Sequence, residues 1–318
     1  MMIFPLLCRS RFMGIDEFFC AAVAGMISRA PCHPLDTIKT VAYTADAAGH
    51  DFGFRRGFQD ILAREGIRGF YRGVGIATFG SAPGVGTYLL SYEVAKRKVE
   101  EYERLPKVLA HLACGLWAEA VSCIFWVPID VVKERCQSQH PGVEGRYTSS
   151  LDGFRTVVRN ESWRGLYKGY WSTLASFGPT SAIYFMAYEE FNKLFEPLKL
   201  SPFVGGLLAA GLGNAVAAVA TNPLEMVKTR LQVQRAVLTV NGIASPTTQF
   251  TYNYKSFASG LNEVVKEYGI FGLQRGVVSR MMYTVPNAAM TMALYQAIKD
   301  KVTTAPAYQE VKRVVALA

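Results

Sequence analysis

Apolar residues along this chain come in long blocks that are separated by shorter polar stretches. The first block runs from Ile15 to about Val41. Further blocks cover about 74–99, 107–137, 171–195, 202–234 and 275–301. A helix that crosses a bilayer needs about 20 residues, and the blocks reach that length. The pattern therefore predicts six membrane-length helices and an all-α membrane protein.

A short amphipathic helix is expected after the first block. Residues 51–65 are polar apart from a helical apolar stripe that includes Phe54 and Phe58. Comparable stretches follow the third block at 151–161 and the fifth block at 255–267. One unit is thus a long helix, a short helix and a second long helix, and the chain contains it three times.

One short motif ends the first long helix of every unit: a proline, an acid two residues later and a lysine three residues after the acid. The copies are Pro34, Asp36 and Lys39; Pro128, Asp130 and Lys133; and Pro223, Glu225 and Lys228. Successive acids are 94 and 95 residues apart, which indicates three copies of one supersecondary unit. The predicted repeats are residues 15–101, 107–195 and 202–301, between tails of residues 1–14 and 302–318.

The three prolines are expected to bend their helices, because proline removes a backbone hydrogen bond and clashes with the preceding turn. A membrane helix tolerates this where neighbouring groups satisfy the freed carbonyls. Pro34, Pro128 and Pro223 stand at equivalent places in the three repeats. They are therefore predicted to bend the three helices alike, so that the helix ends converge on one axis.

The acids and lysines of the motif are candidates for a ring of ion pairs, because charges at membrane depth normally face a cavity and pair. An acid and a lysine three residues apart share a helix face, so pairing within one helix is one arrangement. In the other, each acid reaches the lysine of another repeat. The pairs would be Asp36–Lys133, Asp130–Lys228 and Glu225–Lys39. Such a ring would close the bottom of a central cavity.

A second charged pattern ends the even-numbered long helices. It follows a tyrosine in each repeat and supplies Glu93, Lys96, Glu189 and Lys299, which would form a matching ring at the opposite mouth. Asn192 and Gln296 are neutral where a charge is expected, so this ring is weaker than the first. A solvated helix end is the alternative interpretation of each copy.

Composition adds to the membrane interpretation. Half of the 318 residues are apolar and 28 are glycine, which suits close helix packing in lipid. The formal net charge is +9, and the basic residues follow the apolar blocks, as expected beside anionic lipid rather than nucleic acid. The cysteines and histidines lack metal-ligand spacing, and no nucleophile–base set or phosphate-binding glycine loop occurs. We therefore expect no metal site, no cofactor and no enzyme activity.

A further motif precedes each even-numbered long helix. It reads Glu65-Gly66-Ile67-Arg68-Gly69-Phe70-Tyr71-Arg72-Gly73 in repeat one, with related segments at 161–169 and 268–276. Together with the Pro-x-acid-x-x-Lys motif, it resembles the mitochondrial carrier family over about residues 15–301. The resemblance implies a monomeric transporter of the mitochondrial inner membrane that works by alternating access. The short helices would lie on the matrix side.

The resemblance also implies roles for the charged rings. The ring of Asp36, Lys133 and their counterparts would be the matrix gate, and the ring that includes Glu93 would be the cytoplasmic gate. Cardiolipin would bind near three turns where backbone amides at helix N-termini suit phosphates. These turns are Arg72-Gly73, Lys168-Gly169 and Arg275-Gly276.

Four residues depart from the pattern of the family. Val41 stands where the first repeat usually has arginine, and Ser162 replaces a glycine. Tyr268 and Gln274 replace the acid and the aromatic residue of the third turn. The lost charges are expected to affect gate strength and lipid contact more than the fold.

Candidate substrate residues come from two arguments. Positions seven and eleven before each gate acid lie four residues apart on a helix and are expected to face inward. They are Arg29 and Gly25, Cys123 and Glu119, and Ala218 and Asn214. The resemblance adds positions before the bend prolines of the even-numbered helices. These are Gly80, Ser81, Ser176, Phe177, Tyr283 and Thr284.

This set offers one cation, one anion, hydroxyls and aromatic faces. Glu119 would bind an amino or sulfonium group and Arg29 a carboxylate, unless the two form a structural ion pair. The segment around Glu119 resembles the S-adenosylmethionine carrier branch, and 280–286 resembles the iron-transporting mitoferrin branch. S-adenosylmethionine or a related zwitterion is the expected substrate, with iron as the alternative. A non-transporting membrane scaffold is the alternative from another class, and it predicts a broken gate.

Overall fold

A computed structural model describes most of the chain. The described residues are 15–44, 54–100, 107–139, 147–198, 201–234, 239–240, 243–244 and 254–304. The predicted N-terminal tail and most of the predicted C-terminal tail lie outside these ranges.

Long helices form the body of the protein. The first helix of each repeat is α2 (Ile15–Thr44), α6 (Lys107–Gln137) and, in repeat three, α9 (Pro202–Ala220) followed by α10 (Asn222–Val233). The second is α4 (Val74–Phe79) followed by α5 (Ser81–Glu100), then α8 (Tyr170–Phe195) and α12 (Val277–Thr304). The short helices are α3 (Phe54–Glu65), α7 (Ser150–Leu166) and α11 (Phe257–Gly272). Single turns η1 (Ile67–Tyr71) and η2 (Glu196–Leu198) and strands β1 (Thr239–Val240) and β2 (Ile243–Ala244) complete the described elements.

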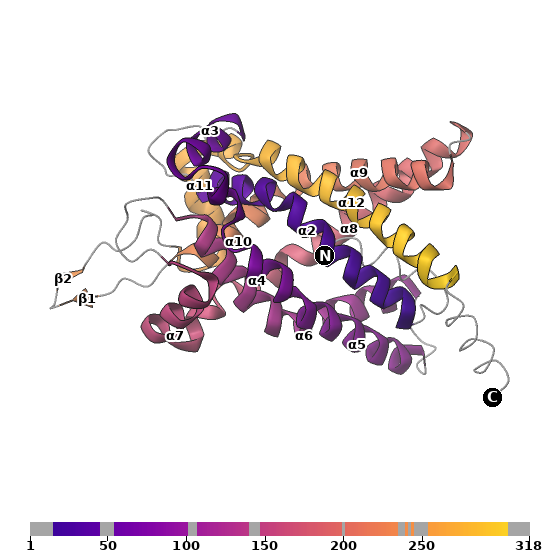
Figure 1. Ribbon diagram of the computed structural model, residues 1–318, viewed down its shortest axis with the longest axis horizontal. Coiled ribbons are helices and arrows are strands. Elements are labelled where there is room, and N and C mark those ends of the chain that lie inside the picture. Colours follow the sequence, from indigo (N-terminus) through magenta and orange to yellow (C-terminus); the bar gives the residue numbers. More distant parts are fainter. Residues whose placement is uncertain are drawn as a thin grey trace.

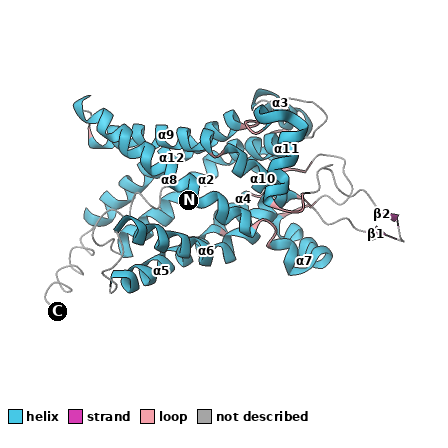
Figure 2. Ribbon diagram, turned by 180° about the vertical axis from the view of Figure 1, so that it is seen from behind, coloured by secondary structure: helices cyan, strands magenta, loops and turns pink. Residues whose placement is uncertain are grey.

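The long helices pack in a closed ring. Helix α5 packs against α6, α8 against α9, and α12 against α2, so each of these contacts joins two repeats. The short helices α3, α7 and α11 gather at one end of the bundle, on the side of β1 and β2, whereas α5 and the end of α12 reach the other end (Figures 1 and 2). The two ends of the bundle therefore differ in structure.

The turn between the short helix and the second long helix has the same backbone in all three repeats. Gly66, Ser162 and Gly269 have φ values of 64°, 62° and 68°. Seven residues later, Gly73, Gly169 and Gly276 have φ values of 74°, 82° and 72°. The repeated turn motif of the sequence thus specifies a repeated backbone conformation.

The helix is interrupted beside the motif proline in repeat three and not in the other two repeats, and the equal bends expected at the three prolines stay a prediction. Helices α2 and α6 continue through Pro34 and Pro128. In repeat three the chain breaks at Thr221, and the helix axis turns by 69° between α9 and α10. Pro223 lies in the first turn of α10, where its missing N–H breaks no helical hydrogen bond.

Side chains donate to three carbonyls beside the break in repeat three, one of which, that of Ala217, also keeps its bond from the backbone N–H of Thr221 at 2.9 Å. The hydroxyl of Thr221 donates to the carbonyl of Ala217 at 2.7 Å, and Arg280 donates to the carbonyl of Ala218 at 3.2 Å. Gln274 donates to the carbonyl of Val219 at 3.3 Å. Arg280 and Gln274 therefore supply hydrogen bonds to backbone carbonyls beside the break.

Two of the described helical stretches are long and apolar enough to cross a membrane on composition alone. They are Ala113–Gln137 and the bent pair Val204–Ala220 with Asn222–Val233. The other long helices carry more charge. Arg29, Asp36 and Lys39 of α2 face the interior described below, whereas most charges of α5, α8 and α12 lie toward the C-terminal ends of these helices. The prediction of six spans therefore stays a prediction.

Candidate functional site

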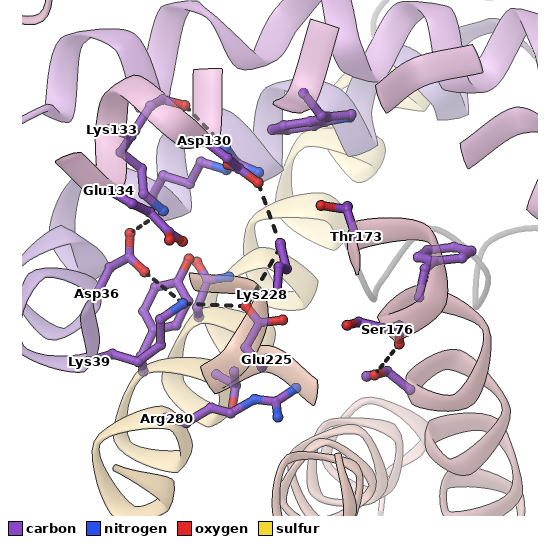
Figure 3. A pocket seen from close by; sticks show the side chains of 18 of the residues that line it. Asp36, Lys39, Asp130, Lys133, Glu134, Thr173, Ser176, Glu225, Lys228 and Arg280 are labelled. Carbon is purple, nitrogen blue, oxygen red and sulfur yellow. Dashed lines mark hydrogen bonds and ion pairs between the residues drawn. The ribbon is translucent and has the colours of Figure 1, made fainter. Parts of the chain in front are cut away.

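A cavity lies inside the ring of long helices, and all three repeats line it (Figure 3). Its volume is about 210 Å³. The predicted residues that line it include Arg29, Glu119, Ser176, Phe177, Asn214, Tyr283 and Thr284. Charged residues from the three Pro-x-acid-x-x-Lys motifs line one end of it.

The structure contains the three pairs between repeats that the motif spacing predicts. Lys133 Nζ lies 2.9 Å from Asp36 Oδ2, Lys228 Nζ lies 3.7 Å from Asp130 Oδ2, and Lys39 Nζ lies 3.8 Å from Glu225 Oε1. Helices α2, α6 and α10 each contribute one acid and one lysine, so the pairs join all three (Figure 3).

Pairing within a helix, the other arrangement, occurs in addition. Lys39 Nζ is 3.4 Å from Asp36 Oδ1, and Lys228 Nζ is 3.8 Å from Glu225 Oε1, each three residues away. Each of these lysines therefore bridges its own helix and a neighbouring one. The cluster is a network, and the Asp36–Lys133 pair is its shortest contact between helices.

Glu119 on α6 also lines the cavity, eleven residues before the motif acid Asp130 of the same helix. It is 1% exposed, and the thiol of Cys123 donates to its Oε1 at 3.5 Å. Its Oε2 is buried and has no hydrogen-bond partner within the described part of the chain. A buried carboxylate oxygen without a partner carries a large desolvation cost, so Glu119 is poised to accept a bond from a ligand.

The two cavity arginines already have partners. Arg29 donates to the carbonyl of Ala77 at 3.1 Å, and its guanidinium lies 4.7 Å from the ring of Trp126. Arg280 donates to the carbonyl of Ala218 and to Thr221 Oγ1 at 3.1 Å. The structural ion pair between Arg29 and Glu119 is therefore not formed among the described residues.

Five predicted substrate residues lie outside the cavity lining: Gly25, Gly80, Ser81, Cys123 and Ala218. Cys123 is fully buried and packs with Val127 and Val131. Gly80 marks the break between α4 and α5, and a Cβ there would lie 3.2 Å from Ile129. Ser81 is buried and bonds the carbonyl of Thr78 at 2.7 Å. A step of four residues rotates a position by about 40° around the helix, which is enough to turn Cys123 away while Glu119 faces inward.

The sequence argument also missed cavity residues. His33, Trp126, Glu134, Arg280 and Asn287 line the cavity. A basic or acidic residue inside an apolar block was a usable signal for Arg280 and Glu134. For Trp126 and Asn287 the sequence carries no comparable signal, because an aromatic or amide side chain fits many helix positions.

The second charged pattern is found near the end of the bundle away from the short helices. Glu93 pairs with Arg97 at 3.1 Å, Lys193 pairs with Glu190 at 2.7 Å, and Lys299 lies 5.7 Å from the ring of Tyr295. These three contacts lie along single helices. The ring of Glu93, Lys96, Glu189 and Lys299 stays a prediction.

The turn of repeat two carries a buried charge network beside the short helix α7. Arg135 is fully buried and donates to Glu161 Oε1 at 2.6 Å and Oε2 at 3.1 Å, and Lys168 pairs with the same carboxylate at 3.0 Å. Burial alone would raise the pKa of Glu161. The hydrogen bonds and charges from Arg135 and Lys168 outweigh burial and lower that pKa below its ordinary value of 4.5.

The basic residues of the predicted cardiolipin turns contact their own protein. Arg72 pairs with Glu65, and Lys168 also donates to the carbonyl of Gln234 at 3.1 Å. Arg275 has no acid at the equivalent position, and its guanidinium instead stacks 4.0 Å from the ring of Tyr268. Gly73 and Gly169 are the N-caps of α4 and α8. The backbone amides of these turns are therefore the groups to consider for a phosphate.

The chain matches one known protein family over most of its length. The family described as "Mitochondrial carrier protein" matches it three times, over residues 13–103, 105–198 and 199–305. Members of this family are transporters rather than enzymes.

Individual relatives carry different names. The chain is 33% identical over 298 residues to "Folate transporter 1, chloroplastic" from Arabidopsis thaliana, covering 87% of the chain and 92% of the relative. It is 29% identical to "Mitoferrin" from Dictyostelium discoideum, covering 87% and 91%. It is 28% identical to "Mitochondrial glycine transporter A" from Danio rerio, covering 91% and 96%.

Proposed function

The chain belongs to the mitochondrial carrier family, and from this premise we propose that its cavity carries a small zwitterionic solute across the mitochondrial inner membrane. The observation that carries the proposal is Glu119, whose Oε2 is buried and unpartnered among the described residues while it lines the cavity. A cationic group of the solute would supply the missing partner.

The ion-pair network would be the matrix gate. Its acids and lysines join α2, α6 and α10, and separating these helices would expose charges that the closed arrangement pairs. The ring that includes Glu93 would close the opposite mouth in the other state. A non-transporting scaffold would not need all three pairs between repeats, so their presence supports transport.

The remaining contacts of the solute follow from what the cavity offers. Arg29 and Arg280 each have guanidinium N–H groups that the bonds to Ala77 and Ala218 do not use. These N–H groups would bind a carboxylate of the solute. Lys39 already lies 5.2 Å from the ring of Tyr283, which leaves Phe177 to stack on a ring of the solute. Thr284 Oγ1 is a further buried group without a partner among the described residues.

S-adenosylmethionine combines these features, and it is the first substrate that we propose. It has a sulfonium and an amino group for Glu119, a carboxylate for an arginine and an adenine ring for Phe177. The relatives named for glycine and folate transport make an amino acid or a folate the nearest other choices.

Iron is the second candidate, favoured by the relative named mitoferrin. Within the described ranges no group of three or more His, Cys, Asp or Glu side chains has an arrangement that fits a metal ion. An iron carrier would therefore bind its cargo with fewer protein ligands than a resident metal site uses.

Thermal stability of the purified protein tests the substrate. A solute that binds only the folded protein stabilises it by about 2.7 kcal/mol at 100 times its Kd, so the unfolding midpoint should rise by several degrees. We expect this rise with S-adenosylmethionine, its loss in Glu119→Gln, and its retention in Cys123→Ser, since Cys123 lies outside the cavity lining. Equal shifts in wild type and Glu119→Gln, or a shift with ferrous iron alone, would reject the proposed substrate.

The membrane arrangement is part of the same proposal. Six spanning helices, a monomer, and cardiolipin at the turns of Gly73, Gly169 and Gly276 follow the family pattern. The positive φ at each of these glycines gives the three turns one shape, which supports three equivalent lipid sites.

A further inference from the structure

The gate network contains one acid more than its threefold plan requires. Glu134 directly follows the gate lysine Lys133, and the equivalent positions in repeats one and three are Thr40 and Thr229. Glu134 lines the cavity and is 2% exposed. Figure 3 shows it beside the side chains of Asp36, Lys39 and Lys133. Repeat two thus places a fourth carboxylate in a gate that the motif builds from three.

The Glu134 carboxylate has no lysine of its own. Its Oε2 is buried without a hydrogen-bond partner, and no ion pair within 4.0 Å includes it among the described residues. The titratable groups around it include Lys133 and Asp130 on α6, Asp36, Lys39 and Tyr43 on α2, and Lys228 on α10.

All three of these lysines are already engaged. Lys133 contacts Asp36 at 2.9 Å, Lys39 contacts Asp36 and Glu225, and Lys228 contacts Asp130 and Glu225. The cavity arginines, Arg29 and Arg280, donate to carbonyl and hydroxyl oxygens, so an ionised Glu134 would be a buried charge with no cation in ion-pair contact among the described residues. A buried charge without its own partner is costly, and the group avoids that cost by neutralisation.

We propose that the closed gate holds one proton on Glu134 and releases it when the gate opens, so that transport is coupled to proton movement. This inference rests on the gate role proposed above. Glu134 lines the cavity, so the proton reaches it from the cavity side while the gate is closed. When α2, α6 and α10 separate, water solvates the carboxyl group, which then loses its proton to the newly opened side as an ordinary glutamic acid does at neutral pH.

Infrared spectroscopy of the purified full-length protein at pH 7 tests the proton site without any solute. A protonated carboxyl group has a C=O stretch that is separate from that of a carboxylate. We expect Glu134→Gln to lose the intensity of one protonated carboxyl group per chain relative to wild type. Glu134→Thr restores the threefold pattern of Thr40 and Thr229, and it should lose the same intensity. Glu119→Gln should keep the Glu134 signal. Unchanged intensity in both Glu134 variants would overturn the proposal.

Liposomes with a pH-sensitive dye inside test the coupling, with S-adenosylmethionine added outside. We expect wild type to acidify the interior in proportion to the solute that enters, and Glu134→Gln to acidify it less for each solute molecule that enters. Solute entry into wild-type liposomes without acidification would reject proton coupling. Absence of S-adenosylmethionine entry would reject the proposed substrate, and the infrared result would still decide the proton site.

Discussion

Ser162 has a backbone conformation that suits glycine. Its φ and ψ are 62° and −177°, close to the values of Gly66 and Gly269 at the same place in the other repeats. This region is essentially confined to glycine, and another residue there costs about 1 to 3 kcal/mol. The contacts of the surrounding turn therefore keep Ser162 in this strained conformation.

Ser162→Gly should therefore stabilise the protein by about 1 kcal/mol and raise the unfolding midpoint by about 2 °C in a thermal melt. The reverse change in repeat one, Gly66→Ser, is the matched control and should lower the midpoint by a similar amount. A lower midpoint in Ser162→Gly would show that the serine side chain makes a stabilising contact that outweighs the strain.

Gln274 shows how a departure from the motif keeps its structural role. In repeat two, Tyr167 donates its hydroxyl to the carbonyl of Ile124, which Pro128 frees four residues earlier along the helix. In repeat three, Gln274 stands at the position of Tyr167 and donates to the carbonyl of Val219, four residues before Pro223.

Tyr167→Phe removes one donor from a carbonyl that has no helical partner. The loss should destabilise the protein by about 1 to 3 kcal/mol, which a thermal melt measures. Gln274→Leu should have an effect of the same size, because it leaves the carbonyl of Val219 without its donor. A change near zero for Tyr167→Phe would mean that lipid headgroups or water replace the hydroxyl.

At the scale of elements, buried charges tie the short helix α7 to α6 and α10. Arg135 contacts Glu161 of α7 and donates to the carbonyl of Gln232 on α10 at 3.0 Å. Repeat one has Val41 where repeat two has Arg135, and Val41 packs with Ile38, Ile61 and Phe70. The missing arginine of repeat one is therefore replaced by apolar packing between α2 and α3.

Arg135→Met should destabilise the protein by about 3 to 5 kcal/mol, because it leaves Glu161 buried with only one cationic partner. Lys168→Met is the matched control, since Lys168 pairs with the same carboxylate but its side chain is 31% exposed. We expect it to cost at most about 1 kcal/mol in the same thermal melt. Equal losses of stability in the two variants would mean that the burial of Arg135 adds nothing to its ion pair with Glu161.

The pH dependence of stability follows from Glu161. Its pKa is lower in the folded protein than its ordinary value of 4.5, so its contribution is present above that pH and is lost as the pH falls below it. Wild type should be more stable than Glu161→Gln at pH 7, and the difference in unfolding midpoint should shrink below about pH 4.5. A difference that stays constant down to pH 3 would contradict the assignment.

The repeat motifs made much of this structure predictable, because the same short pattern recurs at equivalent places in the three repeats. The spacing of Asp36 and Lys133 specified the pair at 2.9 Å, and the glycines of the turn motif specified left-handed backbone at fixed places. The lining of the cavity was less predictable. Cys123 and Glu119 lie one helical turn apart, yet only Glu119 faces the cavity, because the exact rotation of α6 depends on its packing partners.

For the whole molecule, the ion pairs of the proposed gate differ in length between the three helix pairs that they join, and each such helix contact is called a seam below. Asp36 and Lys133 lie 2.9 Å apart with side-chain exposures of 4% and 12%, and Gln137 also bridges α6 to Thr37 of α2 at 3.2 Å. The Asp130–Lys228 and Glu225–Lys39 pairs are longer, at 3.7 and 3.8 Å. The α2–α6 seam should therefore resist opening more than the other two.

Lys133→Ala should consequently lower the unfolding midpoint of the closed protein more than Lys228→Ala does. Lys133→Ala leaves the buried Asp36 with Lys39 as its one ion-pair partner among the described residues. Lys228→Ala removes two longer contacts, to carboxylates that are 20% and 21% exposed. Equal changes in the unfolding midpoint would indicate that the ion pairs of the network contribute equally to stability.

Charge reversal separates a gate from a merely stabilising cluster. Lys133→Glu places a third acid beside Asp36 and Asp130, so the closed state can no longer form, and uptake of S-adenosylmethionine into liposomes should fall to the level of empty liposomes. Adding Asp36→Lys restores opposite charges across the α2–α6 seam. Recovery should be partial, because residue 36 then repels Lys39, which now contacts Asp36 at 3.4 Å. A cluster that only stabilises the fold predicts that Lys133→Glu keeps its uptake at a temperature well below its own unfolding midpoint. Loss of uptake in this folded single variant, with recovery in the double variant, is the outcome that a gate predicts.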